Sequence, residues 1–325
     1  MNVFLNKPIP EPGLQLLRDP KINLTIAHTT KLSRSEWLSY CQMADVVLNV
    51  GKNNFDKDFF DQCPNVKAIC LFSVGYDHVD ISEASKRKVT VSNTPDVLTN
   101  ATSDTAFLLM LMVSRLAGYN LEKVKSGIRN PVYDPVANLG QELYGKTLGI
   151  FGLGRIGIEM AKKCINAYGM NVLYHNRRRN PEAEQSLNAS YVSMDILLAK
   201  SDVVSIHANY SEDSYRLFNN QLFRKMKPNA IFINTARGGF VDEADLYKAL
   251  VSKTIWGAGL DVSDPEPMNT ASDLLSLPTV CVLPHIGSAT IEARNKMAEL
   301  AAQNVIDFAH GKKMRTCINM EAHDS

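Results

Sequence analysis

Three polar side chains in the second half of the chain have the types that hydride addition to a ketone requires. They are Arg237, Glu266 and His285, each in a short segment that follows an apolar stretch. Histidine can give a proton to the developing alkoxide, a carboxylate beside it would hold the ring and raise its pKa, and a guanidinium can bind a substrate carboxylate. A lone histidine after a strand is more often structural, but the three together predict the acid, its partner and the substrate clamp of a reductase.

A glycine-rich turn earlier in the chain predicts where the reductant binds. The apolar run 148–151 leads into Gly152, Gly154 and Gly157 at the G-x-G-x-x-G spacing, and a helical pattern follows. In dinucleotide-binding folds the first glycine permits a tight turn, the second lets the backbone approach a pyrophosphate, and the third lets helix and strand pack closely. Since a strand and a helix flank the motif, it favours a cofactor site over an ordinary turn.

The strand after the glycine motif ends in a basic segment, which predicts the type of cofactor. A carboxylate that binds the ribose 2′-hydroxyl of NAD normally stands about twenty residues after the motif. Asn176 stands there instead, followed by Arg177 and Arg178. Guanidinium groups bind a 2′-phosphate, which a carboxylate would repel. We therefore predict that the cofactor is NADPH/NADP, preferred over NADH, and that these three residues recognise its 2′-phosphate. The alternative is that the arginines at 177–179 form a solvated loop tip without a ligand.

The elements that must position these groups alternate between short apolar strands and helices. Strands are expected at residues 2–5, 22–27, 45–48, 66–71 and 89–91, and, after the glycine motif, at 171–174, 203–206, 230–234, 257–261 and 281–283. This rhythm predicts an α/β protein with two doubly wound parallel-sheet lobes. We expect a flavodoxin-like substrate (catalytic) domain from residues 1–98 plus 291–325, a Rossmann NAD(P)-binding domain from 99–290, and the substrate cleft between them.

A long helical pattern over residues 99–125 follows the first five strands. Its part 106–113 is apolar all round, which predicts burial on every side, between the domains or at a subunit contact. The segment 126–145 then looks loose, and so do the last residues after Gly311.

Composition excludes several classes of function. The 325 residues suffice for about two domains, and 45% hydrophobic with 21% charged residues is typical of a soluble globular protein. A net charge of +1 creates no field that would draw the chain to nucleic acid or a membrane, and the longest uncharged apolar run is too short to cross a bilayer. The six cysteines form no C-x-x-C pair, so we expect reduced thiols, no metal site and a cytoplasmic location.

The sequence resembles the D-isomer-specific 2-hydroxyacid dehydrogenase family and, within it, the glyoxylate/hydroxypyruvate reductases. The resemblance covers most of the chain and rests on 73–78, 93–95, the glycine motif and the segments around the three polar residues of the first paragraph. The segment 284–290, Pro-His-Ile-Gly-Ser-Ala-Thr, is especially specific.

The resemblance implies a role for each site residue. His285 would be the general acid, Glu266 its partner and Arg237 the group that binds the 2-oxoacid. Further substrate contacts would come from the backbone N–H groups of Val74 and Gly75 and from Ser288. Further cofactor contacts would come from Thr102, Arg155, Ile156, His207, Thr235, Asp261 and Gly287, with Asp261 orienting the nicotinamide.

The implied activity is the reduction of small 2-oxoacids, such as glyoxylate and hydroxypyruvate, to the D-2-hydroxyacids glycolate and D-glycerate. The resemblance also implies a homodimer whose cleft closes by hinge motion, which would exclude water from the hydride path. Some of these reductases place a tryptophan from the loop 126–145 into the partner subunit's pocket. This loop has none, so the preferred 2-oxoacid stays open.

Other functions in the same fold remain as alternatives. A D-3-phosphoglycerate dehydrogenase, or another D-2-hydroxyacid dehydrogenase, usually carries an acidic residue where Asn176 stands. A formate dehydrogenase relative would pair its histidine with glutamine. A dinucleotide-sensing co-repressor keeps the same three polar residues, but carries long disordered extensions that are not expected here.

Overall fold

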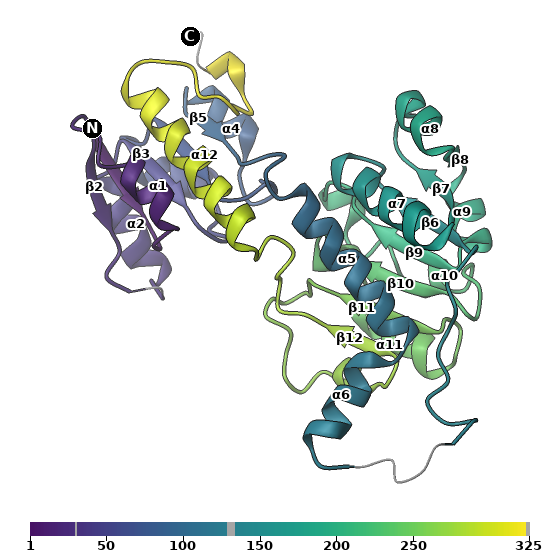
Figure 1. Ribbon diagram of the computed structural model, residues 1–325. Coiled ribbons are helices and arrows are strands. Elements are labelled where there is room, and N and C mark those ends of the chain that lie inside the picture. Colours follow the sequence, from purple (N-terminus) through teal and green to yellow (C-terminus); the bar gives the residue numbers. More distant parts are fainter. Residues whose placement is uncertain (30, 129–133, 323–325) are drawn as a thin grey trace. The chain divides into compact units, whose positions relative to one another are not determined.

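The computed structural model describes residues 1–29, 31–128 and 134–322 of the chain, and it divides into two compact units. Unit 1 comprises Met1–Leu98 with Ala289–Ser325, and unit 2 comprises Thr99–Ser288 (Figure 1). Each unit is built on its own parallel sheet with helices on both faces. The predicted α/β class with two parallel sheets is therefore confirmed.

The sheet of unit 1 has five parallel strands in the order β2-β1-β3-β4-β5. The strands are β1 (Asn2–Leu5), β2 (Asn23–Ile26), β3 (Val46–Asn49), β4 (Ala68–Leu71) and β5 (Thr90–Ser92). All five were predicted, β1 with the same bounds and the other four with bounds within two residues. Every residue of β3 and β4 is buried, because helices cover both faces of a parallel sheet and select uninterrupted apolar runs.

Helices from the two ends of the chain pack together on one face of this sheet. They are α1 (Glu11–Leu16) and α12 (Ile291–Ala309), which lie side by side (Figure 1). A Cβ at Gly13 would come within 2.6 Å of the Ala298 carbonyl oxygen, so only glycine allows this approach. The return of α12 to β3 and β4 makes the last part of the chain an integral piece of unit 1.

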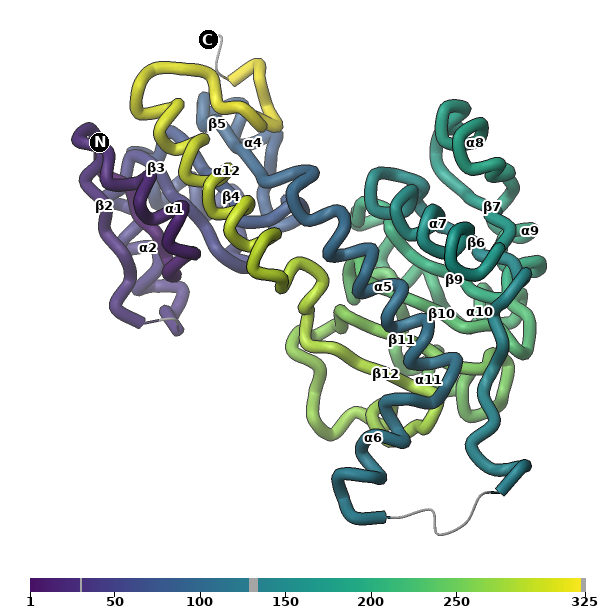
Figure 2. The backbone as a smooth tube through the Cα atoms, in the orientation of Figure 1, coloured from purple at the N-terminus to yellow at the C-terminus, as the bar shows by residue number. Residues whose placement is uncertain are grey.

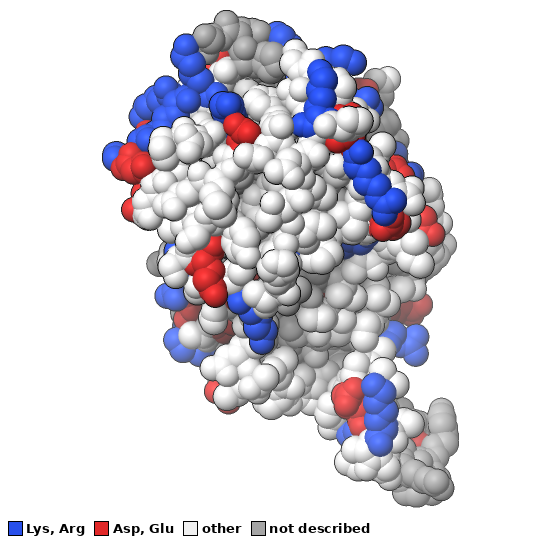
Figure 3. Space-filling model, turned by 90° about the vertical axis from the view of Figure 1, so that its left-hand side faces the viewer, with Lys and Arg blue, Asp and Glu red and all other residues white. Residues whose placement is uncertain are grey.

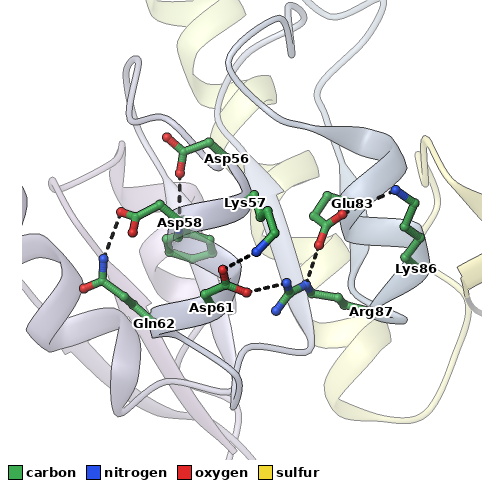
Figure 4. Close-up of polar contacts among 9 residues, drawn as sticks. Asp56, Lys57, Asp58, Asp61, Gln62, Glu83, Lys86 and Arg87 are labelled. Atoms are coloured by element: carbon green, nitrogen blue, oxygen red, sulfur yellow. Dashed lines mark hydrogen bonds and ion pairs between the residues drawn. The ribbon is translucent and has the colours of Figure 1, made fainter.

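Three helices follow β2, β3 and β4, and two of them are joined by charged side chains. They are α2 (Arg34–Gln42), α3 (Lys57–Gln62) and α4 (Ile81–Lys86). Figure 4 shows Asp61 of α3 between Lys57 and Arg87, each 2.5 Å away, while Arg87 also reaches Glu83 of α4 at 2.8 Å. Exposed pairs of this kind contribute about 0–1 kcal/mol each, so they add little to the stability of the unit.

The C-terminal residues are ordered against β5, which corrects the prediction of a loose end. Cys317 forms an antiparallel bridge with Ser92, and Asn319 is fully buried. The Asn319 Oδ1 accepts from the Val91 N–H at 2.8 Å, and its Nδ2 donates to the Val89 carbonyl at 2.9 Å. A polar side chain thus satisfies the open edge of the sheet, a function that hydrophobic patterning does not reveal. The predicted loose residues 323–325 lie outside the described part.

The sheet of unit 2 has seven parallel strands in the order β12-β11-β10-β9-β6-β7-β8. They are β6 (Thr147–Phe151), β7 (Asn171–His175), β8 (Ser190–Tyr191), β9 (Val203–Ile206), β10 (Ile231–Asn234), β11 (Gly257–Leu260) and β12 (Val280–Val282). Only the two-residue β8 was not predicted. The order reverses between β6 and β9, and ligands of open α/β sheets bind at such a switch point, beyond the carboxyl ends of the strands.

Two sets of helices cover the faces of this sheet. The long α5 packs on β10, β11 and β12 and against α7, whereas α9 packs on β6 and β7 (Figure 2). The bounds are α5 (Thr99–Ser114), α6 (Ala117–Lys125), α7 (Arg155–Tyr168), α8 (Pro181–Leu187), α9 (Met194–Lys200), α10 (Asn220–Phe223) and α11 (Glu243–Val251).

The helical pattern over residues 99–125 is two helices, so the prediction of one continuous pattern is wrong. Leu116 has φ +52°, a left-handed conformation that separates α5 from α6. Within 106–113, Leu109 and Met110 are fully buried whereas Leu108 is 46% exposed in the single chain, so the predicted burial on every side, between the domains or at a subunit contact, stays a prediction. One side of α5 therefore faces away from the core of unit 2.

The surface and the cysteines agree with the balanced composition. Lys and Arg stand among Asp and Glu over the face shown in Figure 3, in line with the net charge of +1. All six cysteines are free thiols. Within the described ranges, no helix has the length and apolar character to cross a membrane, and no group of His, Cys, Asp and Glu is arranged to hold a metal ion.

Candidate active site

The glycine loop joins β6 to α7 at the switch point of unit 2. Gly152 has φ +100°, and a Cβ there would come within 2.3 Å of the Ala208 backbone nitrogen in the segment that follows β9. A Cβ at Gly157 would come within 2.6 Å of the Gly152 carbonyl oxygen. The first and third glycines are therefore required by the packing of the chain itself.

Gly154 differs, because nothing in the chain requires it. It has φ −96°, and a Cβ there would meet no atom within 4 Å. The backbone N–H groups of Ile156 and Gly157, at the start of α7, donate to no acceptor among the described residues. Free N–H groups at a helix N-terminus bind phosphate. The open space above Gly154 therefore fits the pyrophosphate of a dinucleotide.

In the basic segment after β7, some side chains already have partners in the chain and others have none among the described residues. The Asn176 Oδ1 accepts from the Leu153 N–H at 2.7 Å, which fastens the glycine loop to the end of β7. Arg179 forms an ion pair with Glu184 of α8 at 2.6 Å. Arg177 and Arg178 are exposed and make no ion pair within the described part of the chain.

The three residues with the chemistry of a ketone reductase lie on loops after neighbouring strands. Arg237 follows β10, Glu266 follows β11 and His285 follows β12. A Cβ at Gly238 would come within 2.1 Å of the Ser263 carbonyl group, so the loops after β10 and β11 are in direct contact. The strand order places these three residues at the sheet edge that carries the glycine loop, as predicted.

His285 and Glu266 form a short hydrogen-bonded ion pair between Nδ1 and Oε1. The histidine side chain is 40% exposed and the glutamate 23% exposed, so the ring reaches the surface while its partner is largely covered. Because the carboxylate engages Nδ1, the Nε2 atom is the ring nitrogen left to meet a ligand. His285 also has φ +56°, a left-handed conformation that sets the direction of the side chain.

Asp261 holds the loop that carries His285. Its side chain is 1% exposed, and its two oxygens accept from the Ile286 N–H at 2.8 Å and the Gly287 N–H at 2.7 Å. Burial raises the pKa of this carboxyl, and the two backbone hydrogen bonds oppose that rise. A Cβ at Gly287 would stand 3.0 Å from the Asp261 Oδ2, so a side chain there would crowd the carboxylate.

Several residues expected at the cofactor carry polar groups in suitable places. The Thr235 Oγ1 is buried and has no hydrogen-bond partner in the described chain, so it is left for a ligand or a water. Thr102 of α5 lies close to Gly287. The His207 Nε2 is 2.8 Å from the Ser205 Oγ, and burial lowers the pKa of His207 to about 4. Arg155 begins α7.

In unit 1, the loop after β4 carries the two backbone donors expected to bind a carboxylate. The Val74 carbonyl accepts from the Asn93 Nδ2 at 2.7 Å, and the Gly75 carbonyl accepts from the Ser73 Oγ at 2.8 Å. The N–H groups of Val74 and Gly75 donate to no acceptor within the described residues. The loop therefore offers donors while its carbonyls are engaged, as anion-binding loops do. Ser288 is the last, partly exposed residue of unit 2.

Sequence reasoning missed a residue that supports Arg237. Asn234 ends β10 and is fully buried; its Oδ1 accepts from the Ala236 N–H at 3.0 Å and its Nδ2 donates to the Arg237 carbonyl at 2.8 Å. The signal in the sequence is a polar residue that ends an otherwise apolar strand. Ser205, the partner of His207, is likewise a polar residue in an otherwise apolar strand, one position before the end of β9.

Two parallel sheets, a glycine loop at a switch point and an Arg-Glu-His set along one edge define a nicotinamide-dinucleotide-dependent oxidoreductase. Residues 107–287 match the family model described as D-isomer specific 2-hydroxyacid dehydrogenase, NAD binding domain. The chain belongs to the D-isomer-specific 2-hydroxyacid dehydrogenase family. It is thus an NAD(P)-dependent oxidoreductase with 2-hydroxyacid dehydrogenase activity.

Curated relatives and solved structures agree over nearly the whole chain. A glyoxylate reductase from Thermococcus litoralis is 40% identical, over 98% of this chain and 97% of that protein. The structure of a glyoxylate reductase from Paecilomyes thermophila is 31% identical, covers 99% of each chain and has a TM-score of 0.87. An NADPH-dependent glyoxylate/hydroxypyruvate reductase from Sinorhizobium meliloti, in complex with NADP and malonate, is 29% identical over 99% of this chain and 97% of that chain, with a TM-score of 0.84.

The lowered pKa of His207 predicts a pH-dependent stability. The ordinary pKa of histidine is 6.5, and that of folded His207 is about 4. Between these pH values the side chain is protonated in the unfolded chain but neutral in the folded chain. The free energy of unfolding therefore falls as the pH falls through this window. When the pH is lowered from 7.5 to 5, we expect His207 to lower the free energy of unfolding by about 2 kcal/mol. Urea unfolding at both pH values measures this loss of stability. In His207→Gln the loss between pH 7.5 and 5 should be about 2 kcal/mol smaller than in the wild type. In the control His28→Gln, at an exposed histidine, it should be the same as in the wild type. Equal losses in both variants would contradict the prediction.

Proposed function

We propose that the protein is an NADPH-dependent reductase of small 2-oxoacids, such as glyoxylate and hydroxypyruvate, which yields glycolate and D-glycerate. The observation that carries the proposal is the His285–Glu266 pair beside the Arg237 loop, on the sheet edge that holds the glycine loop. The names of the relatives support the same substrates, since the curated protein and both solved structures are glyoxylate reductases.

Each of the residues has a distinct role in this mechanism. The reduced nicotinamide, when bound, supplies the hydride. The His285 Nε2 donates a proton to the oxygen on which negative charge develops, and Glu266 stays on Nδ1 and stabilises the imidazolium. Arg237 binds the carboxylate of the 2-oxoacid and polarises its carbonyl. Asp261 acts through the His285 loop, because its oxygens hold the two N–H groups that follow the histidine.

Removal of the proposed acid should slow the chemical step without loss of cofactor. We expect His285→Ala to lower kcat for glyoxylate about 10²–10⁴-fold, the usual contribution of a positioned general acid. NADPH oxidation followed by absorbance measures kcat, and fluorescence titration measures the Kd for NADPH, which should stay within about twofold. His28→Ala serves as the control with an exposed histidine of unit 1. Turnover like that of the wild type in His285→Ala would refute the role.

The proposed NADPH preference is supported by which of the three arginines already have an ion-pair partner. Arg179 already has Glu184 as its partner, which leaves Arg177 and Arg178 as the guanidinium groups available to a 2′-phosphate. The carboxylate of Glu184 in α8 is engaged by Arg179, and Asn176 places no negative charge next to the ribose. The structural relative from Sinorhizobium meliloti is itself described as NADPH-dependent.

A double substitution should shift the cofactor preference from NADPH towards NADH. In Asn176→Asp with Arg177→Ala, the new carboxylate keeps an oxygen for the Leu153 N–H, repels a 2′-phosphate and can accept from a 2′-hydroxyl. We expect the ratio of kcat/KM for NADPH over NADH to fall at least about tenfold, as the loss of one charged hydrogen bond implies. Arg179→Ala is the matched control and should change the ratio far less. An unchanged ratio in the double variant would mean that the phosphate binds elsewhere.

We also propose that the chain acts as a homodimer through the exposed apolar side chains of α6, of Ile128 and of residues 134–144. None of the residues of α6 is buried, although a helix of nine residues has little stability of its own. Large apolar side chains are exposed on α6 and after it: Leu121, Val124, Ile128, Val136, Leu139 and Tyr144. Apolar surface of this extent marks an interface more often than a free surface.

Light scattering after size exclusion tests the homodimer. The wild type should have about twice the chain mass of 36.0 kDa. Val124→Glu should shift the protein towards the monomer, because it would bury a charge at the interface. Val251→Glu, at an exposed valine of α11, should leave the mass unchanged. A monomeric wild type would contradict the proposal.

A further inference from the structure

The segment between β10 and α11 contacts the loop that carries Glu266 at two points. The first is Gly238, where a Cβ would come within 2.1 Å of the Ser263 carbonyl group and 2.7 Å of the Asp264 nitrogen. The second is Glu243, the first residue of α11, whose Oε1 accepts from the Asp264 N–H at 2.9 Å. Both contacts therefore engage the same peptide group of the loop.

The position of Glu243 is set by the way α11 begins. Asp242 is the N-cap of this helix: its side chain accepts from the Asp245 N–H at 3.1 Å, and its own N–H donates to the Phe218 carbonyl at 3.0 Å. Leu246, one turn further along, is fully buried. Because the first turn is capped and packed, the carboxylate of Glu243 approaches the loop from a fixed point.

The carboxylate of Glu243 forms one hydrogen bond, to the Asp264 N–H, and no ion pair among the described residues. Burial raises the pKa of this carboxyl, and the bond from the Asp264 N–H opposes the rise. An acidic residue in the first turn of a helix also interacts favourably with the helix dipole, but that interaction needs no partner in a neighbouring loop. The dipole therefore explains the residue type and not the contact with Asp264.

The loop after β11 has few backbone groups by which it can be held. Residues 264–267 read Asp-Pro-Glu-Pro, and because proline has no N–H, only Asp264 and Glu266 can donate from the backbone. All four residues are exposed. The Ser263 Oγ donates to the Pro265 carbonyl at 2.8 Å, which is a bond within the loop itself. The bond from the Asp264 N–H thus ties an exposed, proline-rich loop to α11.

We propose that Glu243 is a positioning residue, which holds the loop after β11 so that Glu266 stays on the His285 Nδ1. The role rests on the proposed function, in which Glu266 stabilises the imidazolium. Glu266 stands two residues after Asp264, so a displacement of the Asp264 peptide group would carry the carboxylate with it. Asp261 positions the histidine of the pair through the loop after β12, and Glu243 positions its partner through the loop after β11.

Two substitutions of Glu243 separate the hydrogen bond from the charge. Glu243→Ala removes the acceptor, whereas Glu243→Gln keeps an oxygen in its place. We expect kcat for glyoxylate to fall about tenfold in Glu243→Ala, as the loss of a hydrogen bond to a charged group implies, and to stay within about threefold in Glu243→Gln. Asp195→Ala, which removes an exposed first-turn carboxylate from α9, is the control and should leave kcat unchanged. NADPH oxidation measures kcat, and urea unfolding shows that each variant is folded.

Two further measurements distinguish positioning from a merely structural role. An imidazolium is stabilised less when its carboxylate is held less firmly. The alkaline limb of the kcat profile should therefore move to lower pH in Glu243→Ala and not in Glu243→Gln. In a Glu266→Ala background, Glu243→Ala should lower kcat by less than about twofold more, because it acts through Glu266.

Three results would overturn the positioning role: equal kcat in Glu243→Ala and Glu243→Gln, an unmoved alkaline limb, or additive losses with Glu266→Ala. A wild type inactive with glyoxylate would instead refute the proposed function. The role of Glu243 can then be read by NMR at neutral pH from the His285 ring signal of protein labelled with carbon-13 histidine, assigned by its absence in His285→Ala. This signal should shift in Glu243→Ala and stay in place in Glu243→Gln. An unshifted signal in Glu243→Ala would overturn the role.

Discussion

The hydrogen bonds from Ile286 and Gly287 to the buried carboxylate of Asp261 are the constraint on which the site depends. They tie the loop after β12 to the end of β11, so that His285 meets Glu266 instead of moving with an unsupported loop. A buried carboxylate is costly unless its oxygens are satisfied, and here backbone N–H groups satisfy both. The same contacts that make Asp261 tolerable in the core therefore also position the proposed acid.

Close backbone approach governs the rest of this sheet edge. Gly152 and Gly238 stand where the chain leaves no room for a Cβ, and they bring the loops after neighbouring strands into contact. Gly154 stands where the chain leaves room, and only a ligand gives a reason for its missing side chain. The distinction separates glycines that build the fold from the glycine that we propose to serve the dinucleotide, a difference that the motif spacing does not show.

An unsatisfied polar atom stands near the proposed cofactor site of unit 2. The Thr235 Oγ1, two positions before Arg237, is buried without a partner among the described residues. Buried polar groups are rarely left unpaired in native proteins, so each such atom in the described chain needs a partner that is not part of the chain. A bound cofactor, as proposed, or a water would supply this partner for Thr235.

The sequence by itself determined the strands, the glycine loop and the Arg-Glu-His set, because each follows from local patterns: apolar runs, glycine spacing and polar residues after strands. It also predicts NADPH over NADH, since position 176 can be counted from Gly157, and this preference stays a prediction. Only the tertiary structure showed that Arg179 is already paired with Glu184, that Leu116 breaks the long helix, and that Asn319 closes the edge at β5. The physical reason is the same for Arg179, Asn319 and Asp261: the energy of a polar side chain depends on the partner it meets, and those partners come from other elements of the fold.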